Sequence, residues 1–330
     1  MLGVYFHIPF CRHACHYCDF HFSTQLKYED LVLDAMRQEM AKRKLEWSEK
    51  VIGSIYLGGG TPSVLSEKNL MSLVTPLFKQ STNDTEITIE VNPEDVSNDF
   101  LKILRQLNFN RISIGIQSFF DDDLASMNRK HTGEAALSAV KRAQDFGIEN
   151  ITADLIYGIP NSSTSKFQEN VGRLLELSLP HFSAYCLTVE KNTVYDRLER
   201  QGQLPQVSED RIEDEFFYLH NRAVQHGFDH YELSNYALPG KQSVHNSNYW
   251  KRFPYVGFGP GAHSFEKNLR RWNVSNNQHY VRAIAKGVED YFEFERLTAI
   301  DELNEKLMTE LRTAKGIQFS DFPDGWKNEK

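Results

Sequence analysis

The sequence is poor in cysteine, has no excess of positive charge and contains no long hydrophobic run. Four cysteines among 330 residues are too few for the disulfide framework of a small secreted domain. No segment approaches the ~18 consecutive apolar residues that a membrane-spanning helix needs. Acidic residues outnumber basic residues by 45 to 37, which gives a net charge of −8. Because general nucleic-acid binders are basic, we expect no nucleic acid among the partners of this protein.

The remaining composition is typical of a soluble globular protein, with 40% hydrophobic and 25% charged residues. A chain of 330 residues fits one large domain or two smaller ones. The first residues lack the basic segment that precedes the apolar core of a signal peptide. We therefore expect a cytoplasmic protein. In a reducing compartment, clustered cysteines more often bind metal or carry out redox chemistry than form disulfides.

Six short segments rich in β-branched and aromatic residues alternate with longer amphipathic segments. The predicted strands span residues 3–10, 51–58, 86–93, 111–118, 150–158 and 181–189. The predicted helices span residues 28–44, 67–80, 98–107, 133–147 and 166–177. Apolar residues recur in these helices at steps of three and four. The alternation predicts right-handed parallel βα units, although periodicity alone does not separate a doubly wound sheet from a barrel.

The two faces of the predicted strands differ in polarity. In the third strand, Ile87 and Ile89 share one face, whereas Thr88 and Glu90 share the other. The next two strands alternate in the same way. A parallel sheet covered on both sides by helices is apolar on both faces. The polar face therefore indicates the lumen of an incomplete barrel, wide enough for a ligand.

Three of the four cysteines, Cys11, Cys15 and Cys18, directly follow the first predicted strand. Three thiolates can bind three irons of a [4Fe–4S] cluster and leave the fourth iron open to a ligand. A dithiol redox pair of Cys15 and Cys18 is an alternative, but it leaves Cys11 unexplained. Structural zinc is another alternative. A zinc site would take its fourth ligand from His13, His16 or His21.

The segment CRHACHYC resembles the CxxxCxΦC signature of the radical S-adenosylmethionine (radical SAM) superfamily, with Tyr17 as the aromatic residue. The blocks YFHIPFCRHACHYCDF, YLGGGTPSVL, IEVNPE, ISIGIQSF, MNRKHT and DLIYGIPNSS resemble, in order, those of the oxygen-independent coproporphyrinogen III oxidase family and its close relatives. The resemblance implies an incomplete parallel (β/α)6 barrel over residues 1–190. It also implies a C-terminal α+β extension over residues 191–330.

The resemblance also implies cofactors and the residues that hold them. Cys11, Cys15 and Cys18 would bind a [4Fe–4S] cluster whose open iron takes S-adenosylmethionine. Further contacts to S-adenosylmethionine are implied at Tyr5, Tyr17, Gly59, Gly60, Thr61, Glu90, Gln117, Arg129 and Asp154. Carboxylates suit ribose hydroxyls, and arginine suits a carboxylate. The alternative is a buried ion-pair network in which Arg129 pairs with Glu90 or Asp154.

Two features resemble the HemW-type haem chaperones rather than the true oxidases. The oxidases carry a fourth cysteine two residues after the last cluster ligand, where this chain has Phe20. The segment HNSNYW fits the HNxxYW haem-binding motif of the chaperone group, with His245 as the implied iron ligand. We expect a carrier that binds haem and passes it to haem-dependent membrane enzymes. The alternative is an enzyme that decarboxylates coproporphyrinogen III.

Several properties stay open at this stage. We assign no catalytic residue, and a homodimer is one of the oligomeric states that the sequence allows. Family members usually continue into a small helical module beyond the position where this chain ends, at Lys330. A naturally short form and a truncation both fit that observation.

Overall fold

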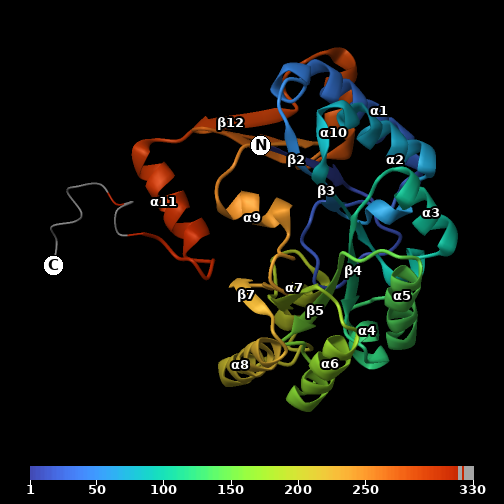
Figure 1. Cartoon of the computed structure of the whole chain (residues 1–330), viewed down its shortest axis with the longest axis vertical. Helices are drawn as coiled ribbons and strands as arrows, with labels where there is room; N and C mark the ends of the chain where they lie inside the picture. Colours follow the sequence, from blue (N-terminus) through green and yellow to red (C-terminus); the bar gives the residue numbers. More distant parts are fainter. Residues whose placement is uncertain (319–321, 323–330) are drawn as a thin grey trace.

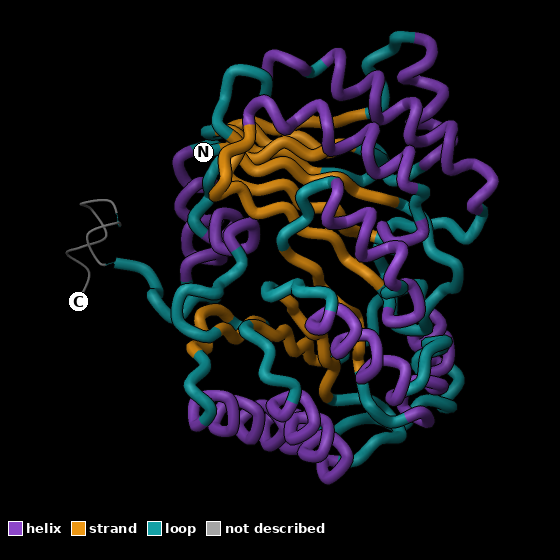
Figure 2. The backbone as a smooth tube through the Cα atoms, turned by 45° about the vertical axis from the view of Figure 1, so that its right-hand side comes forward, coloured by secondary structure: helices purple, strands orange, loops and turns teal. Residues whose placement is uncertain are grey.

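Six parallel strands, each followed by helical structure, form the central part of the molecule (Figures 1 and 2). The structure is a computed structural model that describes residues 1–318 and 322. The strands are β1 (Leu2–Ile8), β2 (Ile52–Gly59), β3 (Ser81–Val91), β4 (Arg111–Gln117), β5 (Ile151–Tyr157) and β6 (His181–Cys186). They pair in chain order and in parallel, which confirms the predicted βα architecture.

Helices cover the outer face of these strands (Figure 2). They are α1 (Glu29–Lys42), α2 (Glu67–Val74), α3 (Asn98–Gln106), α4 (Asp121–Ser126), α5 (Gly133–Asp145) and α6 (Thr164–Glu176). A serine or threonine immediately precedes most of these helices as the N-cap, because its side-chain oxygen accepts a hydrogen bond from a backbone N–H of the first turn. These caps are Ser66, Ser97, Thr132 and Ser163. The predicted helix over 67–80 breaks at Pro76, and its second half is a 3-10 helix.

The strand faces separate as the alternation predicts. Ile112, Ile114 and Ile116 of β4 are at most 1% exposed and belong to the apolar core beneath the helices. Ser113, which lies between them in the sequence, lines a cavity together with inward-facing residues of β2, β3, β5 and β6. The strands therefore curve around a polar lumen.

Residues after β6 extend the sheet at both edges. Their elements are α7 (Val194–Arg200), α8 (Glu209–Gln225), β7 (Asp229–Glu232), β8 (Asn235–Ala237), α9 (Val244–Trp250), β9 (Tyr255–Phe258), β10 (His263–Glu266), β11 (Leu269–Asn273), α10 (Asn277–Lys286), β12 (Phe292–Arg296) and α11 (Ala299–Glu310). Within the described residues the sheet has the order β12-β11-β10-β9-β1-β2-β3-β4-β5-β6-β8-β7. Strand β9 pairs in parallel with β1, and β8 pairs antiparallel with β6.

The sheet stays open because β7 and β12 form its two edges. Residues 319–321 and 323–330 of the predicted extension lie outside the described residues. Over the part of the chain that is described, no helix is both long and apolar enough to cross a membrane.

A buried carboxylate connects the first helix to the strands that the extension adds beside β1. Glu39 on α1 is fully buried and forms an ion pair with Arg43, with 2.8 Å between Oε1 and Nη1. It also accepts hydrogen bonds from Gly259 N (3.0 Å), Asn273 Nδ2 (2.9 Å) and the Tyr280 hydroxyl (2.6 Å). A buried charge is tolerated only when it is paired and hydrogen-bonded in this way. The contacts fix β9 and its neighbours against the barrel.

Candidate functional site

The cysteine loop follows β1 and lies against the loop that follows β2. Thr61 N donates to Phe10 O (2.7 Å), and Thr61 Oγ1 donates to Cys11 Sγ (3.4 Å). Arg129 Nη1 lies 3.6 Å from Cys15 Sγ. Two residues predicted to contact S-adenosylmethionine therefore touch two of the predicted cluster ligands.

The chemistry of the three thiols fits a cluster of several irons. Burial raises the pKa of Cys11 to about 11 and that of Cys18 to about 12, and the nearby Cys15 acts in the same direction on both. Such thiols need a cation to ionise. Among the described residues, no three His, Cys, Asp or Glu side chains have the arrangement that a single metal ion requires. In an iron–sulfur cube each cysteine binds a different iron, so three separate thiols are the ligand set that such a cluster would take.

The histidines that a zinc site would need are directed elsewhere. His16 Nδ1 lies 2.9 Å from Ser126 O, and His21 Nε2 lies 2.7 Å from Asn277 Oδ1. His13 is exposed to solvent. These contacts disfavour the zinc interpretation.

The glycine loop after β2 needs its glycines for steric reasons. Gly59 has φ of +102°, where a side chain is strained. A Cβ atom on Gly60 would lie 2.7 Å from Ile8 O, because Gly60 N donates to that same oxygen. The loop thus packs backbone to backbone against the end of β1, next to the cysteines. Its position fits close approach to a ligand.

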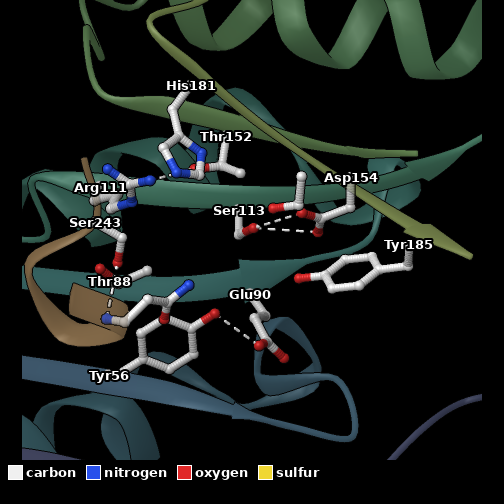
Figure 3. A pocket seen from close by; sticks show the side chains of 12 residues that line it. Tyr56, Thr88, Glu90, Arg111, Ser113, Thr152, Asp154, His181, Tyr185 and Ser243 are labelled. Carbon is white, nitrogen blue, oxygen red and sulfur yellow. Dashed lines mark hydrogen bonds between the residues drawn. The ribbon is translucent and has the colours of Figure 1, made fainter. Parts of the chain in front are cut away.

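Two carboxylates face the lumen, Glu90 from β3 and Asp154 from β5, with β4 between them (Figure 3). The Tyr56 hydroxyl and Gly59 N donate to Glu90, at 2.8 Å and 3.2 Å. Ser113 Oγ donates to Asp154 Oδ2 at 3.1 Å. Burial and the charge of Asp154 raise the pKa of Glu90 to about 7, and burial raises the pKa of Asp154 to about 6. Both groups can therefore exchange a proton near neutral pH.

Arg129 does not form the alternative ion-pair network. Its Nη2 donates to Asn92 Oδ1 (2.7 Å) and to Gly115 O (2.8 Å). Within the described part of the chain, no ion pair joins it to Glu90 or Asp154, although its positive charge opposes the rise in the pKa of Asp154. The guanidinium instead lies between the lumen and the cysteine loop.

The other predicted contact residues line the same region. Gln117 ends β4 with φ of +68°, an uncommon conformation for a residue other than glycine and one that is concentrated at functional sites. Tyr17 lies beside Cys15, and burial raises its pKa. Tyr5 lies on the inward face of β1, with its hydroxyl 3.2 Å from His7 Nδ1.

A cavity of about 40 Å³ occupies the lumen (Figure 3). Its walls include Tyr56, Thr88, Glu90, Arg111, Asp154 and His181, and Ser243 and Asn246 close it from the side of α9. Thr88 Oγ1 and His181 Nδ1 are buried there without a hydrogen-bond partner among the described residues. This space suits a few water molecules.

Helix α9, orange in Figure 1, closes the amino-terminal end of the barrel. The Glu86 carboxylate accepts hydrogen bonds from Val244 N and His245 N, both at 3.0 Å. Glu86 also lies 3.7 Å from the buried guanidinium of Arg111, the first residue of β4. A charge that caps a helix from another element fixes the position of that helix. The cysteine loop lies at the opposite, carboxyl-terminal end of the strands.

His245 points into this end of the barrel. Its Nδ1 lies 2.9 Å from Ser54 Oγ, and its ring centroid lies 4.9 Å from that of Tyr56 and 6.2 Å from that of Tyr5. Burial lowers the pKa of His245 to about 4, so the ring is neutral at physiological pH. A neutral imidazole is the form that binds metal.

The sequence did not single out three residues that hold this site together. Ser54 and Tyr56 lie on the inward face of β2, and Glu86 lies on β3. Their partners are far away in the chain, so only the strand alternation could have placed them in the lumen.

Comparisons with known proteins agree with this geometry. The Radical SAM superfamily matches residues 5–174, just over half of the chain. "Heme chaperone HemW" of Bacillus subtilis is 34% identical, covering 98% of this chain and 86% of the relative. The Lactococcus lactis protein of the same name is 35% identical, covering 98% and 85%.

A solved structure supports the fold. Coproporphyrinogen III oxidase (HemN) from Escherichia coli, described as a radical SAM enzyme, matches with a TM-score of 0.83. The match covers 94% of this chain and 75% of the oxidase, at 24% identity. At that identity the likeness concerns the fold alone. The chain belongs to the radical SAM superfamily and, within it, to the family of the heme chaperone HemW.

Proposed function

We propose that this protein is a cytoplasmic haem chaperone that binds haem and transfers it to haem-dependent membrane enzymes. One observation carries the proposal, namely the similarity over 98% of the chain to proteins named heme chaperone. The site residues support it, because a neutral histidine lies at one end of the barrel and three thiols lie at the other. In this proposal the barrel of residues 1–190 holds the cofactors, and residues 191–330 carry the haem segment.

Cys11, Cys15 and Cys18 would hold a [4Fe–4S] cluster, one iron to each thiolate. When bound, the cluster and S-adenosylmethionine supply one-electron chemistry that the side chains of the protein lack. Arg129 would act as a positive charge beside Cys15, where it stabilises the thiolate. Thr61 would donate to the Cys11 thiolate and orient it.

The lumen residues would orient S-adenosylmethionine. Glu90 and Asp154 suit the ribose hydroxyls as acceptors, and the loop of Gly59 and Gly60 brings backbone groups close to the ligand. Gln117, Tyr5 and Tyr17 would complete the contacts, as the family resemblance implies.

His245 would bind the haem iron through Nε2. If His245 Nδ1–H donates to Ser54 Oγ, the lone pair of Nε2 stays available. Metal-bound histidines commonly donate their other ring N–H in this way, which fixes the tautomer and the ring orientation. Ser54 is fully buried, so it holds the imidazole without competition from solvent.

An anaerobic assay tests the proposed function against oxidase activity. Cluster-reconstituted protein loaded with haem is mixed with haem-depleted membranes, and the haem spectrum of the membrane fraction is recorded. We expect haem to move to the membranes. In parallel, the reduced protein receives S-adenosylmethionine and coproporphyrinogen III. Stoichiometric formation of protoporphyrin products, with no haem transfer, would overturn the proposal.

The affinity for S-adenosylmethionine should depend on pH through Glu90. The ribose hydroxyls donate, so they prefer the ionised carboxylate, and a pKa of about 7 leaves Glu90 largely protonated at pH 6. We expect binding about tenfold tighter at pH 8 than at pH 6, because the ionised fraction rises by that factor. Isothermal titration at several pH values measures this.

Glu90→Gln is the control for this pH effect, because S-adenosylmethionine itself titrates. The variant should bind more weakly at pH 8 and lose the part of the pH dependence that Glu90 contributes. A pH profile of the variant identical to that of the wild type would contradict the assignment.

A further inference from the structure

Residues of one strand, β2, contact both the proposed haem ligand and the proposed S-adenosylmethionine site. Ser54 and Tyr56 alternate along β2, so both side chains point into the lumen. Ser54 contacts His245, the proposed haem ligand. Tyr56 lies one pleat farther toward the cysteine loop. Strand β2 then continues into the loop of Gly59.

Tyr56 contacts both proposed sites at once. On one side its ring packs against the His245 ring, with the centroids 4.9 Å apart and the planes tilted by 31°. On the other side its hydroxyl donates to Glu90 Oε1 at 2.8 Å. Glu90 Oε2 in turn accepts from Gly59 N. An uninterrupted series of contacts therefore joins His245 to the glycine loop through a single tyrosine. Figure 3 shows its central hydrogen bond, between Tyr56 and Glu90.

The hydrogen bond from Tyr56 to Glu90 would be stronger with an ionised carboxylate than with a neutral one. A hydrogen bond to an ionised carboxylate is about twice as strong as one to a neutral group. Burial keeps the pKa of Tyr56 well above its usual value, so its hydroxyl remains a donor. A ligand whose hydroxyls bind Glu90 favours the ionised form and strengthens the bond to Tyr56. The tyrosine ring is then fixed against His245, in the position where Ser54 orients the imidazole.

We propose that Tyr56 couples the two sites, so that S-adenosylmethionine and haem each strengthen the binding of the other. This inference rests on the proposed function and assigns Tyr56 as a positioning residue within it. Coupling between two sites is reciprocal, so one factor describes both effects. Typical coupling free energies correspond to factors of about 5 to 150.

The test measures haem affinity with and without S-adenosylmethionine on the cluster-loaded protein. Ferric haem is titrated by its Soret absorbance. We expect at least about fivefold tighter haem binding in the presence of S-adenosylmethionine. The same factor should appear when S-adenosylmethionine is titrated with and without haem.

Tyr56→Phe keeps the ring that contacts His245 and removes only the hydroxyl that contacts Glu90. In this variant, the haem dissociation constant without S-adenosylmethionine divided by the constant with it should fall to about one, whatever the two individual values become. Tyr236→Phe is the matched control, because it removes a buried hydroxyl on β8 that lies outside this cavity and has no hydrogen-bond partner among the described residues. It should keep the wild-type ratio.

The outcomes separate this inference from the function on which it rests. If haem binds through His245 but the wild-type ratio is one, or if Tyr56→Phe keeps the wild-type ratio, coupling through Tyr56 is wrong and the chaperone proposal stands. If the wild-type protein does not bind haem, both are wrong. A loss of coupling in Tyr236→Phe equal to that in Tyr56→Phe would also overturn the role assigned to Tyr56.

Discussion

Replacing Cys15 with serine should remove the iron–sulfur cluster and abolish S-adenosylmethionine binding. Cys11, Cys15 and Cys18 would be the whole set of protein ligands, which leaves one of the four irons without a protein ligand. The loss of Cys15 would leave two irons without one. Serine is a much poorer ligand for iron because its hydroxyl stays protonated. Cys15 also lies 3.6 Å from the guanidinium of Arg129, which would lose its anionic partner.

Iron and sulfide analysis of anaerobically reconstituted protein measures this effect. We expect the iron content to fall from about four atoms per chain to below about one. Cys186→Ser is the matched control, because Cys186 ends β6 and packs against the apolar core away from the cysteine loop. The control should keep its cluster. Four irons in Cys15→Ser, with intact binding of S-adenosylmethionine, would refute the assigned ligand set.

Replacing His245 with alanine should weaken haem binding by at least about tenfold. Removing a residue that only hydrogen-bonds to a metal ligand already lowers metal affinity by about tenfold or more, and removing the ligand itself should cost no less. The imidazole supplies the only iron ligand that we assign, so its removal leaves the haem held by packing alone. Titration with ferric haem gives the affinity, and the position of the Soret band reports the change of axial ligand.

His279→Ala is the control for this substitution. His279 is exposed on α10, where its Nε2 lies 3.3 Å from Asp290, and its loss should leave haem binding unchanged. Thermal unfolding of His245→Ala shows whether α9 stays docked, since Glu86 still caps its backbone. Wild-type affinity and an unchanged Soret band in a folded His245→Ala protein would exclude this histidine as the ligand.

The strand alternation predicted most of the barrel because it reports directly on burial. Glu90 and Ser113 face the lumen, and Ile89 and Ile112 face the helices, as period-two patterning requires. The six parallel strands and their helices were predictable for the same reason.

The closure of the barrel by α9 was not predictable from local sequence. Glu86 caps a helix 159 residues away along the chain, and no pattern near Glu86 signals that contact. Strand β9 contains Gly257, and the glycine-rich sequence around it is typical of a loop. The strand forms because the edge of β1 is free to pair with it. Tertiary pairing of this kind overrides weak local propensity.

Helix α9 and the cysteine loop lie at opposite ends of the barrel strands. The Glu86 and Ser54 contacts keep the helix across the amino-terminal end, while the cysteine loop and the glycine loop surround the opposite end. A polar cavity of about 40 Å³ lies between the two ends. In the proposed function, haem at His245 and S-adenosylmethionine beside the cysteine loop would therefore bind at opposite ends of the barrel. In that arrangement, haem would leave the protein without displacing S-adenosylmethionine.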